Sequence, residues 1–291
     1  LTISTAGLPV AVSKLVSEAN ALGRYNQMRR TFYLSLILFL SLGVISFLIM
    51  FFRADALAAL MNDDKAAAGI RALAPAVICV GCLSALRGYS QGHGNMTPTS
   101  ISQIIEAVTK MIFGLGLRGA VLYLTQREYE TYGTVLGQSY AGQAQAQAVI
   151  AQLASGAAVL GVSLSTAAGL LYLMIRWRKK GDGVPDELVR QSPQPQRAGV
   201  LFKTIIVIAV PVCLGSLAVN FSGIIDLMTV TGRLAEVMQT APQALLDCYG
   251  ANIPEAEIIN NSVHNYLYGA YSGKAVVIAN LVPALTAGLA V

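Results

Sequence analysis

Charged side chains are scarce in this chain, and their scarcity excludes a soluble enzyme. Of the 291 residues, 20 are Lys or Arg and 15 are Asp or Glu, which is 12%, whereas an ordinary soluble domain carries about 25%. Hydrophobic residues make up 55%, and the mean hydropathy is +0.59. A soluble fold of this length could not hide so much apolar surface from water. We therefore expect an integral membrane protein.

Residues that bind metals or form disulfides are also few, with four Cys and two His. Cys79 and Cys82 lie three apart inside the apolar stretch 72–86, where they are expected to act as small buried hydrophobes. Neither His93 nor His264 has a Cys, His or carboxylate at ligand spacing. We expect no metal site, no cofactor and no catalytic residues. No basic patch with interleaved aromatics indicates nucleic acid.

Long apolar runs predict membrane helices. Residues 31–52 give 22 positions without a charge, and a bilayer needs about 20. The run lacks the polar–apolar alternation of a membrane β-barrel, so the expected fold class is all-α and polytopic. The chain starts and ends inside apolar runs, and further helices are expected beyond both ends. The expected helices span residues 1–19, 31–52, 70–90, 98–123, 149–175, 202–226 and 271–291.

The loop charges predict the orientation of these helices, because Lys and Arg collect on the cytoplasmic side. Loop 20–30 has three Arg and no acid, and loop 176–203 has seven basic residues against three acids. Basic and acidic residues balance in 53–71 and 118–130, and acids dominate in 226–274. The loops therefore alternate between inside and outside. We expect a multi-pass protein of the bacterial cytoplasmic membrane.

A hydrophilic segment predicts the domain organisation. Residues 176–199, RWRKKGDGVPDELVRQSPQPQRAG, combine charge, Pro and Gln, as is typical of a solvated linker. This cytoplasmic linker is expected to divide an N-terminal lobe, 1–175, from the start of a C-terminal lobe, 200–291. A faint repeat, LPVAVSK at 8–14 and VPALTAG at 282–288, agrees with the paired repeats of many transporters. The expected architecture is a two-lobed helical transporter bundle with a truncated second lobe.

Two glycine motifs are expected to serve helix packing. Residues 114–119 match the nucleotide-binding pattern GxGxxG but follow an apolar helix, whereas that pattern binds nucleotides after a strand. Gly133 and Gly137 form a GxxxG. Small residues at such spacings allow two membrane helices to approach closely.

Several ionisable residues fall inside apolar runs, where each costs on the order of 3 kcal/mol unless it meets a partner or water. Lys14 with Glu18, and Glu106 with Lys110, are four apart and could neutralise one another or extend to the interface. Alternatively, they line a wet cleft between the lobes, and a mixed-charge cleft suits a large amphiphile with an anionic head. The substrate-binding candidates are Lys14, Lys274, Glu106, Lys110 and Asp226, with Glu18, Asn220 and Arg87 as gating or supporting residues.

The stretch LRGYSQGHGNMTPTSISQIIEAVTK, residues 86–110, resembles the loop between the fourth and fifth helices of the multidrug/oligosaccharidyl-lipid/polysaccharide exporter superfamily. Within that superfamily it is most similar to the stage V sporulation protein B and lipid II flippase branch. Residues 4–23 resemble the second helix of this branch and residues 268–291 its eighth. The resemblance implies two six-helix lobes around a central cavity, with up to two further C-terminal helices.

The resemblance also implies a function, namely flipping of a lipid-linked saccharide, such as the peptidoglycan precursor lipid II, by alternating access. Basic cavity residues of the family hold the diphosphate, and Lys14 and Lys274 fall near its second- and eighth-helix basic positions. The partners would be this saccharide and membrane lipids; a coupling ion, H⁺ or Na⁺, and the oligomeric state stay open. Two alternatives remain, a cation-coupled multidrug exporter of the same superfamily and a membrane-embedded glycosyltransferase using the acidic residues Asp247, Glu255 and Glu257.

Overall fold

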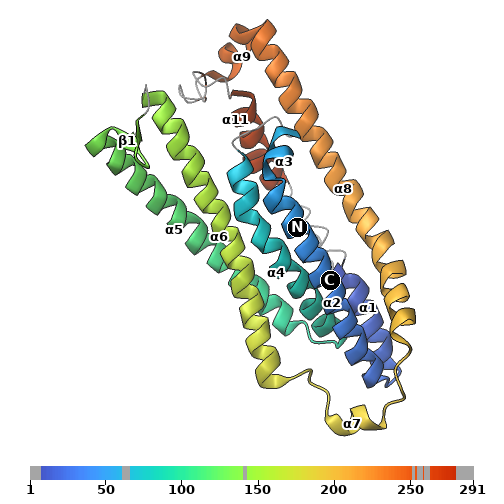
Figure 1. Cartoon of the computed structure of the whole chain (residues 1–291). Coiled ribbons are helices and arrows are strands. Elements are labelled where there is room, and N and C mark those ends of the chain that lie inside the picture. The colour runs from blue at the N-terminus through green and yellow to red at the C-terminus, as the bar shows by residue number, and fades with distance from the viewer. Residues whose placement is uncertain are drawn as a thin grey trace. The chain divides into compact units, whose positions relative to one another are not determined.

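The computed structural model describes residues 8–60, 66–139, 143–250, 253, 258 and 263–279, and these are almost entirely helical (Figure 1). A helix satisfies its own backbone hydrogen bonds inside lipid, so long apolar segments in a membrane favour this fold. The elements are α1 (Leu8–Ala21), α2 (Tyr25–Phe52), α3 (Ala54–Leu60), α4 (Ala66–Gly92), α5 (Thr97–Tyr132), β1 (Thr134–Val135), β2 (Gln138–Ser139), α6 (Gln143–Lys180), α7 (Asp186–Gln191), α8 (Ala198–Thr240), α9 (Pro242–Tyr249), α11 (Val263–Ala270) and the π-helix η3 (Tyr271–Ala275).

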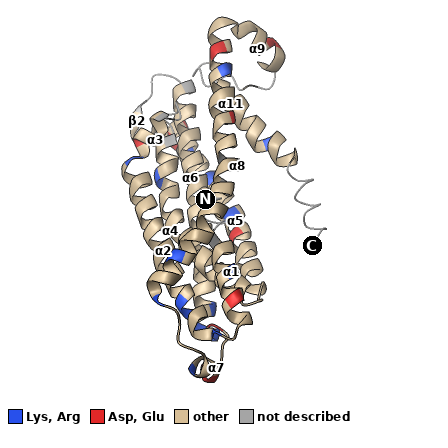
Figure 2. Ribbon diagram, turned by 90° about the vertical axis from the view of Figure 1, so that its right-hand side faces the viewer, with Lys and Arg blue, Asp and Glu red and all other residues tan. Residues whose placement is uncertain are grey.

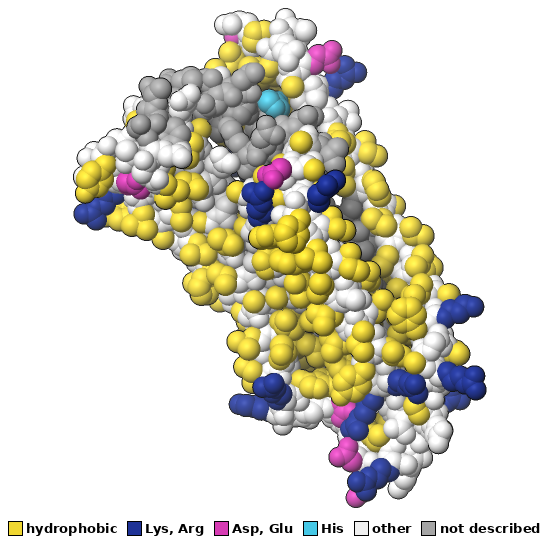
Figure 3. All heavy atoms as spheres, in the orientation of Figure 1, with side chains coloured by type: hydrophobic (Ala, Val, Ile, Leu, Met, Phe, Trp, Pro, Cys, Tyr) yellow, Lys and Arg dark blue, Asp and Glu magenta, His cyan; other side chains and the backbone are white. Residues whose placement is uncertain are grey.

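The predicted all-α, multi-pass membrane fold is confirmed. Five described helices are long and apolar enough to cross a membrane. The first and last expected helices, 1–19 and 271–291, lie partly outside the described residues. On the face shown in Figure 3, apolar side chains cover long stretches of the helix surfaces and Lys and Arg gather toward the helix ends. The five spanning segments are Tyr25–Phe52, Ala67–Gly92, Thr97–Tyr132, Gln145–Lys180 and Ala198–Gly215.

The chain forms two compact units, the first made of residues 1–124 and 152–220 and the second of residues 125–151 and 221–291. In the second unit, Leu245, Ile253 and Val263 form a small apolar cluster around α9 and α11. The first unit holds the larger core. The expected lobe boundary at the hydrophilic linker stays a prediction.

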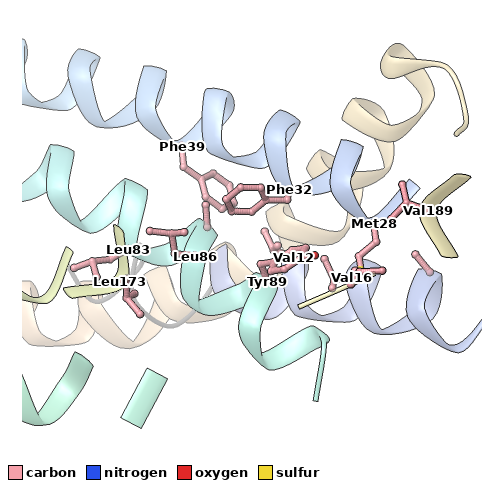
Figure 4. Packing of buried hydrophobic residues seen from close by; sticks show 13 residues of the cluster. Val12, Val16, Met28, Phe32, Phe39, Leu83, Leu86, Tyr89, Leu173 and Val189 are labelled. Carbon is pink, nitrogen blue, oxygen red and sulfur yellow. The ribbon is translucent and has the colours of Figure 1, made fainter. Parts of the chain in front are cut away.

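Helix α4 is central to the core of the first unit because its glycines admit neighbouring backbones. A Cβ on Gly81 would lie 2.6 Å from the carbonyl oxygen of Phe39 in α2. A Cβ on Gly88 would lie 2.7 Å from the carbonyl oxygen of Pro9 in α1, and a Cβ on Gly92 would lie 2.6 Å from that of Ser13. Around these contacts, buried apolar side chains of α1, α2, α4 and α6 form one cluster (Figure 4).

The two glycine motifs differ in outcome. In the first motif only Gly114 lies at a close helix contact, since a Cβ on Gly161 of α6 would lie 2.5 Å from its Cα, whereas a Cβ on Gly116 or Gly119 would meet no described atom within 4 Å. The packing role for Gly133 and Gly137 is wrong. Both have positive φ, +68° and +76°, and a Cβ on either would meet no described atom within 4 Å. Gly133 lies in the turn between α5 and β1, and Gly137 lies in the turn that joins β1 to β2. Glycine is favoured at such φ values because it carries no Cβ.

Candidate functional site

A largely buried ion pair joins α4 to α5 within the first unit. Arg87 is 8% exposed, and its Nη2 donates to Oε2 of Glu106 at 2.5 Å. Its Nε donates to Ser102 Oγ at 2.9 Å, and that hydroxyl donates in turn to the carbonyl oxygen of Thr99 at 2.7 Å. Both charges are thus paired and hydrogen-bonded, as buried charges must be if they are not to destabilise the fold.

The local sequence explains how this pair forms. Helix α4 ends at Gly92 and α5 begins at Thr97, so a short turn connects the two helices. Gly94 has φ of +80°, which favours glycine, and the side chain of Asn95 accepts a hydrogen bond from the backbone N–H of Thr97 at 3.2 Å. The turn lets a residue near the end of α4 meet one in α5.

Helix α6 also packs against the ion pair, at Gly169. A Cβ placed on Gly169 would lie 2.7 Å from Cγ of Glu106 and 3.2 Å from its Cδ. The side chain of Glu106 therefore fits against α6 only because residue 169 is a glycine and has no side chain. Three helices meet at one carboxylate, which fixes its position and its partner.

The structure identifies a different partner for Glu106 from the local one considered above. Glu106 pairs with Arg87, 19 residues earlier in the chain, rather than with Lys110. Lys110 is exposed, and no salt bridge among the described residues includes it. Arg87, expected as a supporting residue, thus has the best defined electrostatic role of the predicted set.

Lys14 and Glu18 lie together on the exposed side of α1. The opposite side of this helix, which includes Val12, Val16 and Ala19, is buried in the core. No salt bridge within the described part of the chain joins the two charged residues. Lys14 therefore keeps an exposed ammonium group on an otherwise mostly apolar helix.

The remaining predicted residues belong to the second unit or to its border. Asp226 is exposed in α8, which continues beyond the expected end at 226 to Thr240. Lys274 is exposed in the π-helix η3, and π-helical turns often occur at functional sites. The side chain of Asn220 is outside the described set. The shared cleft that would join these residues to Lys14 stays a prediction.

Sequence patterns missed a second ionic network, between the start of α2 and the segment after α6. Both Nε and Nη2 of Arg29 bind the carboxylate of Asp182, and Nη2 also lies 3.2 Å from Asp186. Burial acts to raise the pKa of Asp182, but the hydrogen bonds from Arg29 and from the backbone N–H of Val184 outweigh it and lower the pKa. No sequence spacing links residues 153 positions apart.

Charged residues are few along the long helices and more frequent at their ends (Figure 2).

Among the described residues, no group of three or more His, Cys, Asp or Glu could hold a metal ion. The Arg87–Glu106 pair connects α4 to α5, and Arg29 connects α2 to the segment after α6.

Comparison with known proteins matches residues 1–242 to a family described as polysaccharide biosynthesis protein. The chain is 30% identical to Lipid II flippase MurJ of Bacillus subtilis (strain 168) over 189 residues, 62% of the chain and 31% of that protein. It is 37% identical to Stage V sporulation protein B of the same strain over 114 residues, 38% and 21% respectively. It is 26% identical to Uncharacterized membrane protein YabM of that strain over 235 residues, 80% and 38%. The matches thus span less than two thirds of each relative, and no solved structure matches the chain.

Proposed function

Because the chain belongs to the polysaccharide biosynthesis protein family, we propose that it carries a lipid-linked saccharide across the membrane as a flippase or exporter. The family match over residues 1–242 carries this proposal. A relative named as a lipid II flippase and the five apolar helices support it. On this proposal the protein moves its substrate without changing it, and so acts as a transporter rather than an enzyme.

The substrate class sets a physical requirement. A saccharide diphosphate is too polar to enter hydrocarbon, so a hydrated cleft must shield it while its lipid tail stays in the bilayer. A cation at bilayer depth normally faces such a cavity, and ammonium groups bind phosphate oxygens by charge-assisted hydrogen bonds. In this proposal Lys14 and Lys274 hold the diphosphate, and Lys110 and Asp226 adjust the charge of the cleft. The exposure of all four supports that assignment.

Glu106 has a different part in the proposal from the substrate contact first expected. Its carboxylate is bound to Arg87 and packed against Gly169, so it holds α4, α5 and α6 together while the cleft opens on alternate sides of the membrane. The hydrophilic segment after α6 lies on the cytoplasmic side in this scheme. Its excess of Lys and Arg supports that orientation.

Growth of a bacterial strain depleted of its lipid II flippase tests the proposal. We expect the protein to restore growth, and Lys14→Ala to abolish this rescue at an unchanged level of protein in the membrane. Lys179→Ala is the matched control, because it removes an exposed cation at the end of α6. Rescue by Lys14→Ala would reject the role of Lys14. Failure of the inserted wild-type protein, together with drug efflux, would instead favour the multidrug exporter.

A further inference from the structure

A cavity of about 370 Å³ lies where α4 and α6 end, within the first unit. It is separate from the residues assigned to the substrate, and its walls combine aromatic, cationic and hydrogen-bonding side chains. The lining includes Tyr89, His93, Arg176, Trp177, Lys180 and Asp182.

The loop that closes this cavity depends on two glycines. Helix α6 ends at Lys180, and the backbone N–H of Gly181 donates to the carbonyl oxygen of Trp177 at 2.8 Å. Gly181 and Gly183 have φ of +62° and +79°, so the chain can reverse on either side of Asp182 without strain. The ring of His93 lies 3.6 Å from the Cβ position of Gly183, which places the loop over the end of α4.

Aromatic packing holds Tyr89, one of the residues that line this cavity. The ring of Tyr89 lies parallel to that of His93, with centroids 6.4 Å apart, and edge-on to Trp177 at 5.1 Å. Phe32 of α2 contacts Tyr89 at 5.0 Å, and Figure 4 shows these two residues within the apolar cluster. Packed among these rings and 2% exposed, Tyr89 cannot turn freely, so its hydroxyl keeps its position.

Two polar groups of the lining residues have no hydrogen-bond partner within the described part of the chain. The Oη of Tyr89 and the Nδ1 of His93 are both buried and unpaired, as few described polar atoms are, and Tyr89 is only 2% exposed. Buried polar atoms without a partner are uncommon, because each one loses its hydrogen bonds to water and gains no hydrogen bond in return. Their position in the lining of a cavity indicates a ligand or water that supplies the missing bond.

The charge of the lining selects an anion. Arg176 and Lys180 both face the cavity, while the carboxylate of Asp182 is already bound by Arg29 from outside the lining. The cavity lies where the apolar span of α6 ends, beside a Trp and a cluster of cations, as is typical of the headgroup level of a bilayer. Basic pockets between helices at this depth bind anionic lipid headgroups.

We propose that this cavity binds the phosphate of an anionic lipid headgroup, with Arg176 and Lys180 supplying the charge and Tyr89 and His93 the hydrogen bonds. The proposal does not depend on what the protein transports. It predicts that a phospholipid such as phosphatidylglycerol stays bound at the end of α6 when the protein leaves the native membrane.

Native mass spectrometry of the protein in nanodiscs tests this site, with phosphatidylglycerol in a phosphatidylcholine background as the probe. The Arg176→Gln/Lys180→Gln variant should bind phosphatidylglycerol about 30-fold more weakly, since each cation near an anionic headgroup contributes about fivefold. The matched control, Arg178→Gln/Lys179→Gln, removes two exposed cations of the same helical turn that do not line the cavity. It should bind as the wild type does. Equal losses in both variants, or no binding, would overturn the proposal.

Two further measurements complete the test, one with the Tyr89→Phe variant and one with inorganic phosphate. Tyr89→Phe removes the unpaired hydroxyl alone, and it should weaken phosphatidylglycerol binding about fivefold without lowering the thermal midpoint of the lipid-free protein. Unchanged binding would contradict a hydrogen bond to that hydroxyl. Inorganic phosphate, added to nanodiscs of pure phosphatidylcholine, tests the other source. Phosphate binding that needs Arg176 and Lys180, with no preference for phosphatidylglycerol, would overturn the lipid as the ligand.

Discussion

At the scale of residues, the ion pair between Arg87 and Glu106 is the best defined electrostatic contact of the membrane-spanning helices. Removing one member of a buried pair leaves the other charge without compensation and destabilises a fold by about 3–5 kcal/mol, whereas replacing both with apolar residues is often nearly neutral. We therefore expect Arg87→Met and Glu106→Leu each to lower the free energy of unfolding by several kcal/mol, roughly within that range. The double variant should lose much less than the sum of the two.

Unfolding in detergent micelles measures this double-mutant cycle. Lys110→Met is the control, since Lys110 is exposed and forms no salt bridge within the described residues, and such surface changes stay within about 0.5 kcal/mol. Strict additivity of the two single changes would contradict a coupled pair.

The lowered pKa of Asp182 gives a prediction at the same scale. Its carboxylate has a lower pKa in the folded protein than the ordinary value of 3.8, so it stabilises the fold fully above that value. This stability is lost as the pH falls through the lower folded value. Asp182→Asn should reduce the thermal midpoint at pH 7, and the gap to the wild type should narrow only in acid, below about pH 3.8.

A thermal melt from pH 7 to pH 2.5 tests this titration, with Asp186→Asn as the matched control. Asp186 also contacts Arg29, but its side chain is 80% exposed, and exposed ion pairs contribute little. We expect its midpoint to follow the wild type at every pH. A constant gap for Asp182→Asn down to pH 2.5 would argue against the role of its charge.

Spacing along the sequence predicted some of these residues but not their partners. Glu106 stands four before Lys110, and this interval describes only neighbours on one helix. Its actual partner, Arg87, comes from another helix, and a single sequence carries no signal for that contact. The sequence likewise shows Arg29 and Asp182 only as charges in two separate loops. It carries no signal that they form a pair between distant segments.

At the scale of elements, apolar runs predicted the existence of helices better than their ends. The run 31–52 lies inside α2, but α5 extends past 123 to Tyr132 and α8 past 226 to Thr240. Hydropathy reports which part of a helix lies in lipid, whereas a helix continues into water wherever its polar residues also favour that conformation. The contacts between helices depend on glycines whose partners the sequence does not identify.

Gly169 of α6 tests how much such a contact matters. Gly169→Ala would bring a methyl group within 2.7 Å of Cγ of Glu106, so it should push the carboxylate away from Arg87 and lower the thermal midpoint. In the same helix, a methyl group at Gly156 would meet no described atom within 4 Å, so Gly156→Ala is the control. It should raise stability by about 0.5–1 kcal/mol, because alanine favours a helix over glycine. Opposite signs in the two melts are the expected result, and equal stabilisation would contradict the tight contact at residue 169.

At the scale of the whole molecule, the charge pattern and the spanning helices make a joint prediction about topology. One span, α6, separates the turn after α5 from the hydrophilic segment before α8, so these two connections should lie on opposite sides of the membrane. The basic residues favour the cytoplasm for the segment before α8. The turn after α5 is then expected outside the cell.

Labelling of single cysteines tests this topology in intact cells. The four native cysteines would first be replaced by Ala, and then Tyr132→Cys and Gln194→Cys made separately, since both positions are exposed. A maleimide that cannot cross membranes should label residue 132 in intact cells, and residue 194 only after the cells are permeabilised. Labelling of residue 194 without permeabilisation would reverse the orientation. Labelling of both residues in intact cells would mean that α6 does not cross the membrane. That result would contradict the assignment of α6 as a spanning helix.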